Sequence, residues 1–201
     1  MVDAQRPADD PPRIGVLALQ GGYAAHARVL EGLGAEVREV RVPADLEGLD
    51  GLVMPGGEST TMSLGVEREG LAEPLRAFAS AGNPVLGTCA GLIMLDRDHL
   101  GLMDTRAQRN AFGRQVRSFE ADLTFSHLDG GPVHAVFIRA PWIAEHGPGV
   151  EVLAEVDGHP VAARQGELLV LSFHPELGDD TRLHAAFLDR VRELRAGRPA
   201  S

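Results

Sequence analysis

Short apolar runs alternate with amphipathic stretches over the first half of the chain. The apolar runs predict strands at 13–19, 36–42, 51–54 and 84–87. Apolar residues at helical spacing predict helices at 23–33, 71–81 and 90–97. Strands separated by such helices favour a parallel sheet that is covered by helices on both faces.

The second half of the chain has a different rhythm, with strands that follow one another more closely. Apolar runs predict strands at 133–139, 150–156, 160–164 and 168–173. Asp157-Gly158 and Gln165-Gly166 separate the last three, and such pairs are typical of tight hairpin turns. A final amphipathic helix is predicted at 181–194. We therefore expect an antiparallel β extension beside the parallel sheet.

Length and composition indicate one acidic domain. With 201 residues, we expect a single domain at 13–195 between a disordered N-terminal tail (1–12) and a C-terminal tail (196–201). A net charge of −10 without a basic stripe argues against nucleic acid. No apolar run reaches the roughly 20 residues that cross a bilayer, so we expect no membrane contact. The N-terminus lacks a signal-peptide core, and one cysteine fits a reducing cytoplasm, where we expect the protein.

Cys89 is the only cysteine, and it lies where the strand predicted at 84–87 meets the helix predicted at 90–97. A helix N-terminus offers backbone N–H groups and the positive end of a dipole, which favour the nucleophilic thiolate. The small residues Ala90 and Gly91 allow a substrate carbonyl to approach the backbone closely. A lone cysteine is otherwise a buried small hydrophobic residue, so the catalytic interpretation depends on partners elsewhere in the chain.

A candidate base and its orienting acid, His174 and Glu176, follow the last apolar run. Pro175 favours an extended conformation at His174, and in an extended segment the two side chains project to the same side. We expect Glu176 to accept a hydrogen bond from one imidazole nitrogen while the other serves Cys89. For each residue considered alone, a structural interpretation is better than a catalytic one: His174 as a solvated histidine at a strand end and Glu176 as a surface carboxylate. Together with Cys89 they form a nucleophile, a base and an orienting acid.

A glycine-rich loop supplies a third element. Gly56 and Gly57 follow a short apolar run, and their backbone N–H groups suit an oxyanion hole at the carboxyl end of a parallel sheet. A phosphate-binding loop is disfavoured because Glu58 would repel phosphate and the chain has no GxxxxGK[ST] pattern. The remaining alternative is an ordinary turn before a helix N-cap at Ser59 or Thr60.

Five segments together form a recognisable set: LALQG (17–21), PGGESTT (55–61), GTCAGLI (87–93), RNAFGRQ (109–115) and SFHPE (172–176). This set resembles the glutaminase subunit of pyridoxal 5′-phosphate synthase, which belongs to the class I, or triad, glutamine amidotransferases. The resemblance extends from about residue 13 to about residue 191. It implies an α/β fold, a single-domain three-layer sandwich with a mostly parallel, flavodoxin-like sheet and an antiparallel β extension.

The resemblance also implies a reaction and a set of roles. The implied reaction is hydrolysis of L-glutamine to L-glutamate and ammonia, with the ammonia passed to a separate synthase subunit in a large hetero-oligomer. Cys89, His174 and Glu176 are the implied catalytic triad, and the N–H groups of Gly57 and Ala90 the implied oxyanion hole. The implied glutamine-binding residues are Gly57, Glu58, Ser59, Arg109, Ile138 and Arg139.

The chemistry of two of these groups suits the substrate: Arg109 matches a carboxylate and Glu58 an ammonium group. The alternatives are a solvated arginine at Arg109, strand core at Ile138 and an edge-strand charge at Arg139. The chain departs from the family pattern at two places. One is 22–25, near the expected synthase contact, and the other is 96–101, which is shorter than usual.

All 19 basic residues are arginine, so no side chain can form a Schiff base with a sugar or with pyridoxal phosphate. Any carbonyl–amine step therefore needs another polypeptide, as the resemblance implies. The remaining histidines show no metal-ligand spacing, and we expect neither a metal nor a cofactor. His26 matches a family position but receives no catalytic step.

Two other functions stay open. One is a thiol hydrolase of the peptidase or deglycase kind, and the other is a regulatory binding module without turnover. The substitution Cys89→Ala distinguishes an enzyme from a binding module. It abolishes glutaminase or other hydrolase activity, whereas the binding of a regulatory module stays intact. We also expect the free chain to be nearly inactive, since a glutaminase without an acceptor would waste glutamine.

Overall fold

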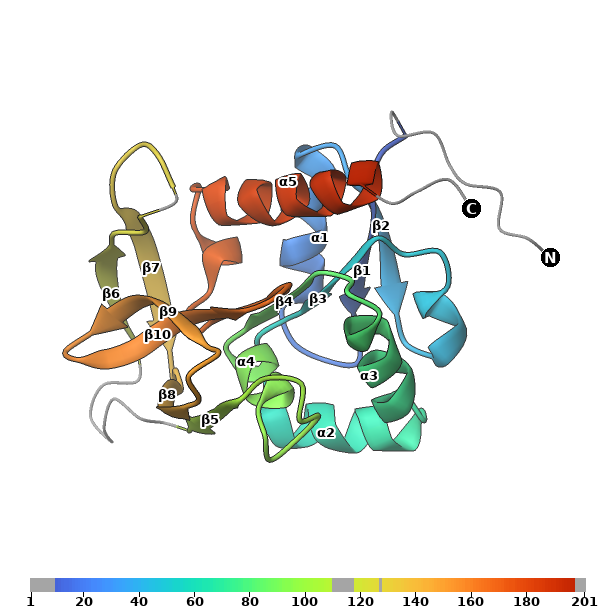
Figure 1. Ribbon diagram of the computed structural model, residues 1–201, viewed down its shortest axis with the longest axis horizontal. Coiled ribbons are helices and arrows are strands. Elements are labelled where there is room, and N and C mark those ends of the chain that lie inside the picture. Colours follow the sequence, from blue (N-terminus) through green and yellow to red (C-terminus); the bar gives the residue numbers. More distant parts are fainter. Residues whose placement is uncertain (1–9, 110–117, 127, 198–201) are drawn as a thin grey trace.

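A seven-stranded sheet runs through the centre of the computed structural model, which describes residues 10–109, 118–126 and 128–197 (Figure 1). The strand order is β2-β1-β3-β4-β11-β10-β9. The parallel strands are β1 (Arg13–Leu17), β2 (Glu36–Val40), β3 (Gly51–Met54), β4 (Val85–Thr88) and β11 (Leu168–Leu171). The antiparallel strands are β10 (His159–Gln165) and β9 (Glu151–Val156). The order of the parallel part is flavodoxin-like, which confirms the predicted fold class.

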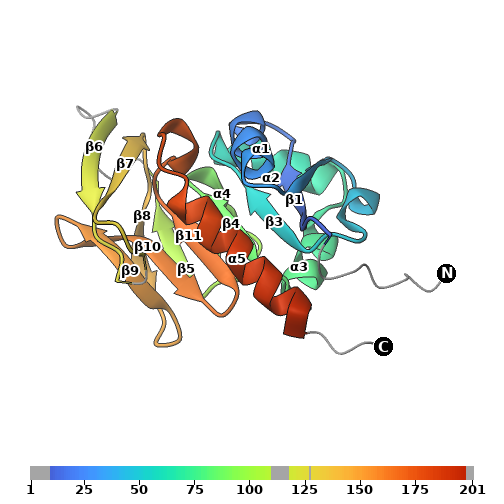
Figure 2. The same ribbon diagram turned by 90° about the horizontal axis from the view of Figure 1, so that it is seen from above.

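Helices cover both faces of this sheet, as Figures 1 and 2 show. One face carries α1 (Tyr23–Gly32) and α5 (Arg182–Gly197). The other carries α2 (Ser59–Arg68), α3 (Ala72–Ser80) and α4 (Ala90–Leu95). Successive side chains of a strand point to opposite faces, so Val53 packs under α1 and α5 while Leu52 and Met54 pack under the other helices. The result is a three-layer arrangement with a hydrophobic core on each side of the sheet.

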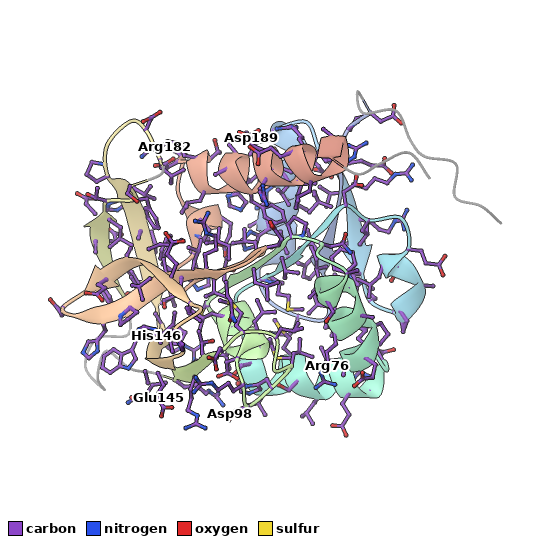
Figure 3. All side chains as sticks on the ribbon, viewed as in Figure 1. Arg76, Asp98, Glu145, His146, Arg182 and Asp189 are labelled. Carbon is purple, nitrogen blue, oxygen red and sulfur yellow. The ribbon has the colours of Figure 1, made fainter. Side chains whose placement is uncertain are left out.

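Two small antiparallel sheets lie beside the central sheet. They pair β5 (Thr105–Gln108) with β8 (Trp142–His146), and β6 (Ser118–Leu123) with β7 (Val133–Ile138). Phe137 of β7 stacks on Phe119 and contacts Phe173, which ties the β6–β7 hairpin to the core. Arg182, at the start of α5, donates to the carbonyls of Asp129 and Pro132 and holds the loop of this hairpin (Figure 3).

The structure adds elements that the sequence pattern did not predict. These are α2, β5, β6, β8 and two short 3-10 helices, η1 (Pro43–Leu46) and η2 (Pro175–Leu177). The alternative interpretation of the glycine loop, a turn before a helix, places the N-cap at Ser59 or Thr60. The structure places it at Glu58, whose carboxylate accepts from the N–H groups of Thr60 and Thr61.

The ends of the chain fall partly outside the described residues. The predicted N-terminal tail, 1–12, is described only from residue 10, and the last residues, 198–201, lie outside the description. Helix α5 continues to Gly197, past the domain end expected at 195. Within the described part of the chain, none of the helices has the length and apolar character needed to span a lipid bilayer.

Close packing of α4 on the sheet requires a glycine. A Cβ at Gly91 would lie 2.0 Å from the carbonyl oxygen of Met54, whereas a Cβ at Gly32 of α1 would meet nothing within 4 Å. Helix α4 therefore rests directly on the backbone of β3.

We expect Gly91→Ala to lower the free energy of unfolding by about 1–3 kcal/mol, the usual cost of overpacking, because backbone atoms must move. Gly32→Ala is the matched control and should change stability little or raise it by up to about 1 kcal/mol, since alanine favours the helix. Urea unfolding measures both. Equal stability of the two variants would contradict the proposed packing constraint.

Candidate active site

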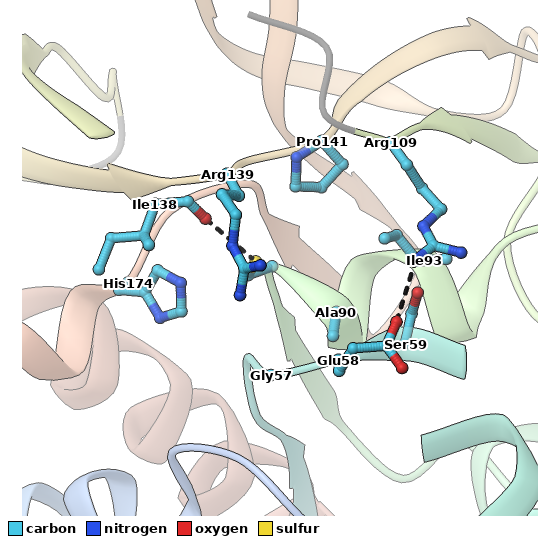
Figure 4. Close-up of a pocket in the computed structure, with 11 residues that line it drawn as sticks. Gly57, Glu58, Ser59, Ala90, Ile93, Arg109, Ile138, Arg139, Pro141 and His174 are labelled. Atoms are coloured by element: carbon cyan, nitrogen blue, oxygen red, sulfur yellow. Dashed lines mark hydrogen bonds and ion pairs between the residues drawn. The ribbon is translucent and has the colours of Figure 1, made fainter. Parts of the chain in front are cut away.

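The loops at the carboxyl ends of β3, β4 and β11 meet the segments at the ends of β5 and β7, and together they line a pocket of about 230 Å³. Its lining comprises Gly57, Glu58, Ser59, Cys89, Ala90, Ile93, Arg109, Ile138, Arg139, Pro141 and His174. Figure 4 shows His174, Ile138 and Arg139 on one side of it and Glu58, Ser59 and Arg109 on the other. Of the residues expected at the site, Glu176 alone is not part of this lining; it lies behind His174.

Cys89 stands at a sharp turn between β4 and α4. Its backbone has a φ of 49°, in the left-handed region that residues with a side chain rarely adopt. The Cys89 N–H donates to the carbonyl of Leu171 at 2.8 Å, which continues the pairing of β4 with β11. The Sγ atom lies 4.0 Å from the carbonyl oxygen of Ile138. A nucleophile on such a strained strand-to-helix turn is exposed to a pocket while its backbone stays fixed.

His174 and Glu176 are in contact, as expected, but not through an extended segment. The His174 Nδ1 atom lies 2.8 Å from Glu176 Oε1, yet Pro175 begins the 3-10 helix η2. Proline is readily accepted at the first position of a helical turn, where its missing N–H costs nothing. The turn thus brings the carboxylate back to the ring. The N–H of His174 donates to the carbonyl of Val136 at 2.9 Å, which anchors this segment to β7.

The environment stabilises a charged His174. Burial lowers the pKa of His174, but hydrogen bonds and charge interactions with Cys89 and Glu176 outweigh it and raise the pKa to about 10. Burial raises the pKa of Glu176, but the hydrogen bond and the charge interaction with His174 outweigh it and hold that pKa below its usual value. At neutral pH His174 is therefore an imidazolium between a sulfur and a carboxylate.

The glycine loop approaches both His174 and Cys89. A Cβ at Gly56 would lie 2.3 Å from His174 Cε1 and 3.2 Å from Cys89 Cβ, so only glycine fits there. The carbonyl of Gly56 accepts from the N–H of Gly22 at 3.0 Å. Gln20 holds Glu58, two residues further along the loop, from both sides: its Nε2 donates to the Glu58 carbonyl at 2.9 Å and its Oε1 accepts from the Glu58 N–H at 3.1 Å.

Glu58 and Arg109, expected to bind the ammonium and the carboxylate of the substrate, contact each other. Arg109 Nη2 lies 3.0 Å from Glu58 Oε1, and Nη1 donates to Thr60 Oγ1 at 3.1 Å. Hydrogen bonds from the N–H groups of Thr61 and Thr60 lower the pKa of Glu58 to about 2, so its carboxylate is ionised at neutral pH. A guanidinium has five N–H donors, and Arg109 can therefore hold Glu58 and a second carboxylate together.

Other residues reach the site without having been assigned to it. Gln20 belongs to segment 17–21, which is part of the family resemblance but to which no role is assigned from the sequence. Ile93 and Pro141 also line the pocket, and as apolar residues they carry no sequence feature that marks a binding site. Residues 110–115 of the RNAFGRQ segment lie outside the described residues. Among the described residues, no group of three or more His, Cys, Asp or Glu side chains is arranged to hold a metal ion.

The chain is similar to known proteins in sequence and in fold. The model of the SNO glutamine amidotransferase family matches residues 16–193. The chain is 55% identical to "Pyridoxal 5′-phosphate synthase subunit PdxT" of Geobacillus kaustophilus, covering 91% of this chain and 96% of that protein. It is 54% identical to the protein of the same name from Frankia alni, covering 93% and 98%. A solved structure titled "Crystal structure of glutamine amidotransferase" matches with a TM-score of 0.83 and 46% identity, covering 89% of this chain and 98% of that one. The chain belongs to the SNO glutamine amidotransferase family.

Proposed function

We propose that this protein is a glutaminase that hydrolyses L-glutamine to L-glutamate and ammonia, and that it supplies the ammonia to the synthase subunit of a pyridoxal 5′-phosphate synthase. The observation that carries the proposal is that Cys89 and His174 line one pocket, with Glu176 bonded to His174 from behind, and that the rim of this pocket bears both a carboxylate and a guanidinium. The names of the two relatives supply the synthase as partner.

The reaction begins with attack of the Cys89 thiolate on the side-chain carboxamide carbon of glutamine. The carbonyl oxygen becomes an oxyanion, and the backbone N–H groups of Gly57 and Ala90 stabilise it. His174 starts as an imidazolium and gives its proton to the departing nitrogen, which leaves as ammonia. Neutral His174 then takes a proton from water, which attacks the thioester and releases glutamate and Cys89.

Recognition of glutamine needs groups of both charges, because its α-carbon carries a carboxylate and an ammonium. Arg109 binds the carboxylate and Glu58 binds the ammonium, and each is also held by the other. Ser59, Ile138 and Arg139 complete the pocket around the substrate chain. The pocket of about 230 Å³ fits a small polar molecule rather than a nucleotide.

The ammonia needs an acceptor on another chain. With no lysine among its 19 basic residues, no side chain of this protein can condense with a carbonyl to a Schiff base. A division of labour follows: this subunit releases ammonia, and the synthase subunit, in a large hetero-oligomeric assembly, uses it. Such a division favours a glutaminase that is active only in the complex.

The direct test measures glutamate release from glutamine by the purified chain, alone and mixed with the synthase subunit of the same organism. We expect release to appear or rise strongly on mixing and to disappear in Cys89→Ala, because the thioester cannot form. Full turnover without the partner would contradict control by the synthase. Hydrolysis of other amides or esters but not of glutamine would favour a different thiol hydrolase. Binding without any turnover would favour a regulatory module.

Arg109→Met should raise the KM for glutamine by about 10- to 100-fold, since a hydrogen bond to a charged group contributes about 1.5–3 kcal/mol. Arg106→Met is the matched control, because Arg106 also pairs with carboxylates, those of Asp98 and Glu145, but is not part of the pocket lining. Steady-state kinetics of the complex provide both values. An equal KM in the two variants would contradict the role of Arg109.

Stability should depend on pH through His174. A histidine whose pKa is raised from 6.5 to about 10 on folding stabilises the fold fully below pH 6.5 and loses this contribution as the pH rises through 10. We therefore expect the free energy of unfolding of the unmodified chain to fall more steeply between these pH values than that of His174→Gln. Urea unfolding at several pH values measures the slopes, and parallel curves would contradict the charged state of His174.

A further inference from the structure

Two buried histidines lie behind the catalytic acid, outside the pocket. His26 of α1 and His184 of α5 are both 0% exposed. His26 Nδ1 lies 2.9 Å from His184 Nε2, and His26 Nε2 lies 3.1 Å from Thr88 Oγ1 and 3.3 Å from Glu176 Oε2. The array thus runs from α5 through α1 to the carboxylate that orients His174, and the residue before Cys89 takes part in it.

The contact with His26 matters because the two oxygens of Glu176 differ in the hydrogen-bond donors around them. Its Oε1 is occupied by His174 at 2.8 Å, whereas Oε2 is buried and has no well-aligned hydrogen-bond donor among the described residues. The ring nitrogen His26 Nε2, at 3.3 Å, is close enough for an electrostatic contact, although its angle is poorer than that of a strong hydrogen bond. A buried carboxylate oxygen without any donor is costly, so a proton on His26 Nε2 stabilises the observed position.

The two possible proton positions between the histidines are not equivalent. If His26 Nδ1 donated to His184, the remaining proton of His184 would be on Nδ1, a buried atom without a partner among the described residues. His26 Nε2 would then turn a lone pair toward Glu176 Oε2. If His184 Nε2 donates to His26 Nδ1 instead, His184 Nδ1 keeps a bare lone pair rather than an unpaired N–H, and His26 carries its proton on Nε2, facing Glu176 and Thr88.

We propose that His26, held in the Nε2–H tautomer by His184, is a positioning residue that fixes the carboxylate of Glu176 so that it orients His174. With Oε1 facing His174 and Oε2 facing His26, the carboxylate cannot rotate away from the imidazole. This inference rests on the proposed glutaminase function, because the value of a fixed Glu176 lies in the reactivity of Cys89 and His174.

The charge state of the array is consistent with this role. Burial lowers the pKa of His26, and burial followed by the nearby His26 lowers the pKa of His184 to about 4, so both rings are neutral at neutral pH. The ionisable groups that face Glu176 are His174 on one side and His26 on the other, with His184 one ring further away. The two neutral rings therefore add no charge beside the ion pair of His174 and Glu176.

The test compares two substitutions at one buried position. His26→Gln keeps an amide N–H directed at Glu176 and an oxygen that accepts from His184, whereas His26→Met fills the space without either. We expect His26→Met to lower kcat in the complex by about 10–100-fold, as is typical for partners one step behind a reacting group in metal sites, with little change in KM. His26→Gln should retain most of the kcat of the unmodified complex.

A second measurement does not depend on glutamine or on the partner. The rate of Cys89 alkylation by iodoacetamide is followed against pH in the free chain, with His99→Met, which alters a histidine paired with Asp96 instead, as the control. We expect His26→Met to shift this profile to higher pH and His26→Gln and His99→Met to leave it unchanged. Ring ¹⁵N shifts should show the Nε2–H tautomer at His26.

The outcomes separate the two proposals. Equal kcat values and equal alkylation profiles for the unmodified chain and His26→Met would overturn the positioning role. Equal impairment of His26→Met and His26→Gln, or an Nδ1–H tautomer at His26, would overturn it as well and leave a purely structural histidine. Absence of glutamate release in the unmodified complex would overturn the glutaminase proposal, while the alkylation profiles would still test His26.

Discussion

The parallel pairing of β3, β4 and β11 is the constraint on which the rest of the site depends. Met54 pairs with Gly87, and Thr88 pairs with Leu171, so the three strands end at nearly the same level. Because they run in one direction, the loops that follow them open on the same edge of the sheet. The glycine loop, Cys89 and His174 come from distant parts of the sequence and meet there without any further linker.

The electrostatics of the site place each charge beside its opposite. His174 lies between Cys89 and Glu176, and at the pocket rim Glu58 lies beside Arg109. A chain with a net charge of −10 would repel an anion in general, but this local pairing presents both signs to a zwitterion. Burial strengthens the inner pair, since Glu176 and His174 are largely removed from water, while the outer pair is half exposed and more readily rearranged.

Sequence patterns predicted the strands of the central sheet and the helices α1, α3, α4 and α5, because long apolar or amphipathic segments are buried in a regular way. They missed α2, whose buried positions include Ser59 and Gly65 rather than a stripe of large apolar residues. They also missed β5, β6 and β8, which are short and largely exposed to solvent on one side. Such strands are stabilised by pairing with another strand, and the pattern within one strand carries no information about that partner.

The sequence by itself determined the chemistry that is available: one thiol, a histidine and a carboxylate two residues apart, adjacent glycines after a strand, and no lysine. These features follow from residue identity and local spacing. Only the tertiary structure decided that η2 folds Glu176 back onto His174, that Glu58 caps α2 and pairs with Arg109, and that His26 and His184 form a buried array behind the acid. The physical reason is that hydrogen bonds and burial depend on which segments pack together, and His26 and His184 meet only because α1 and α5 cover the same face of the sheet.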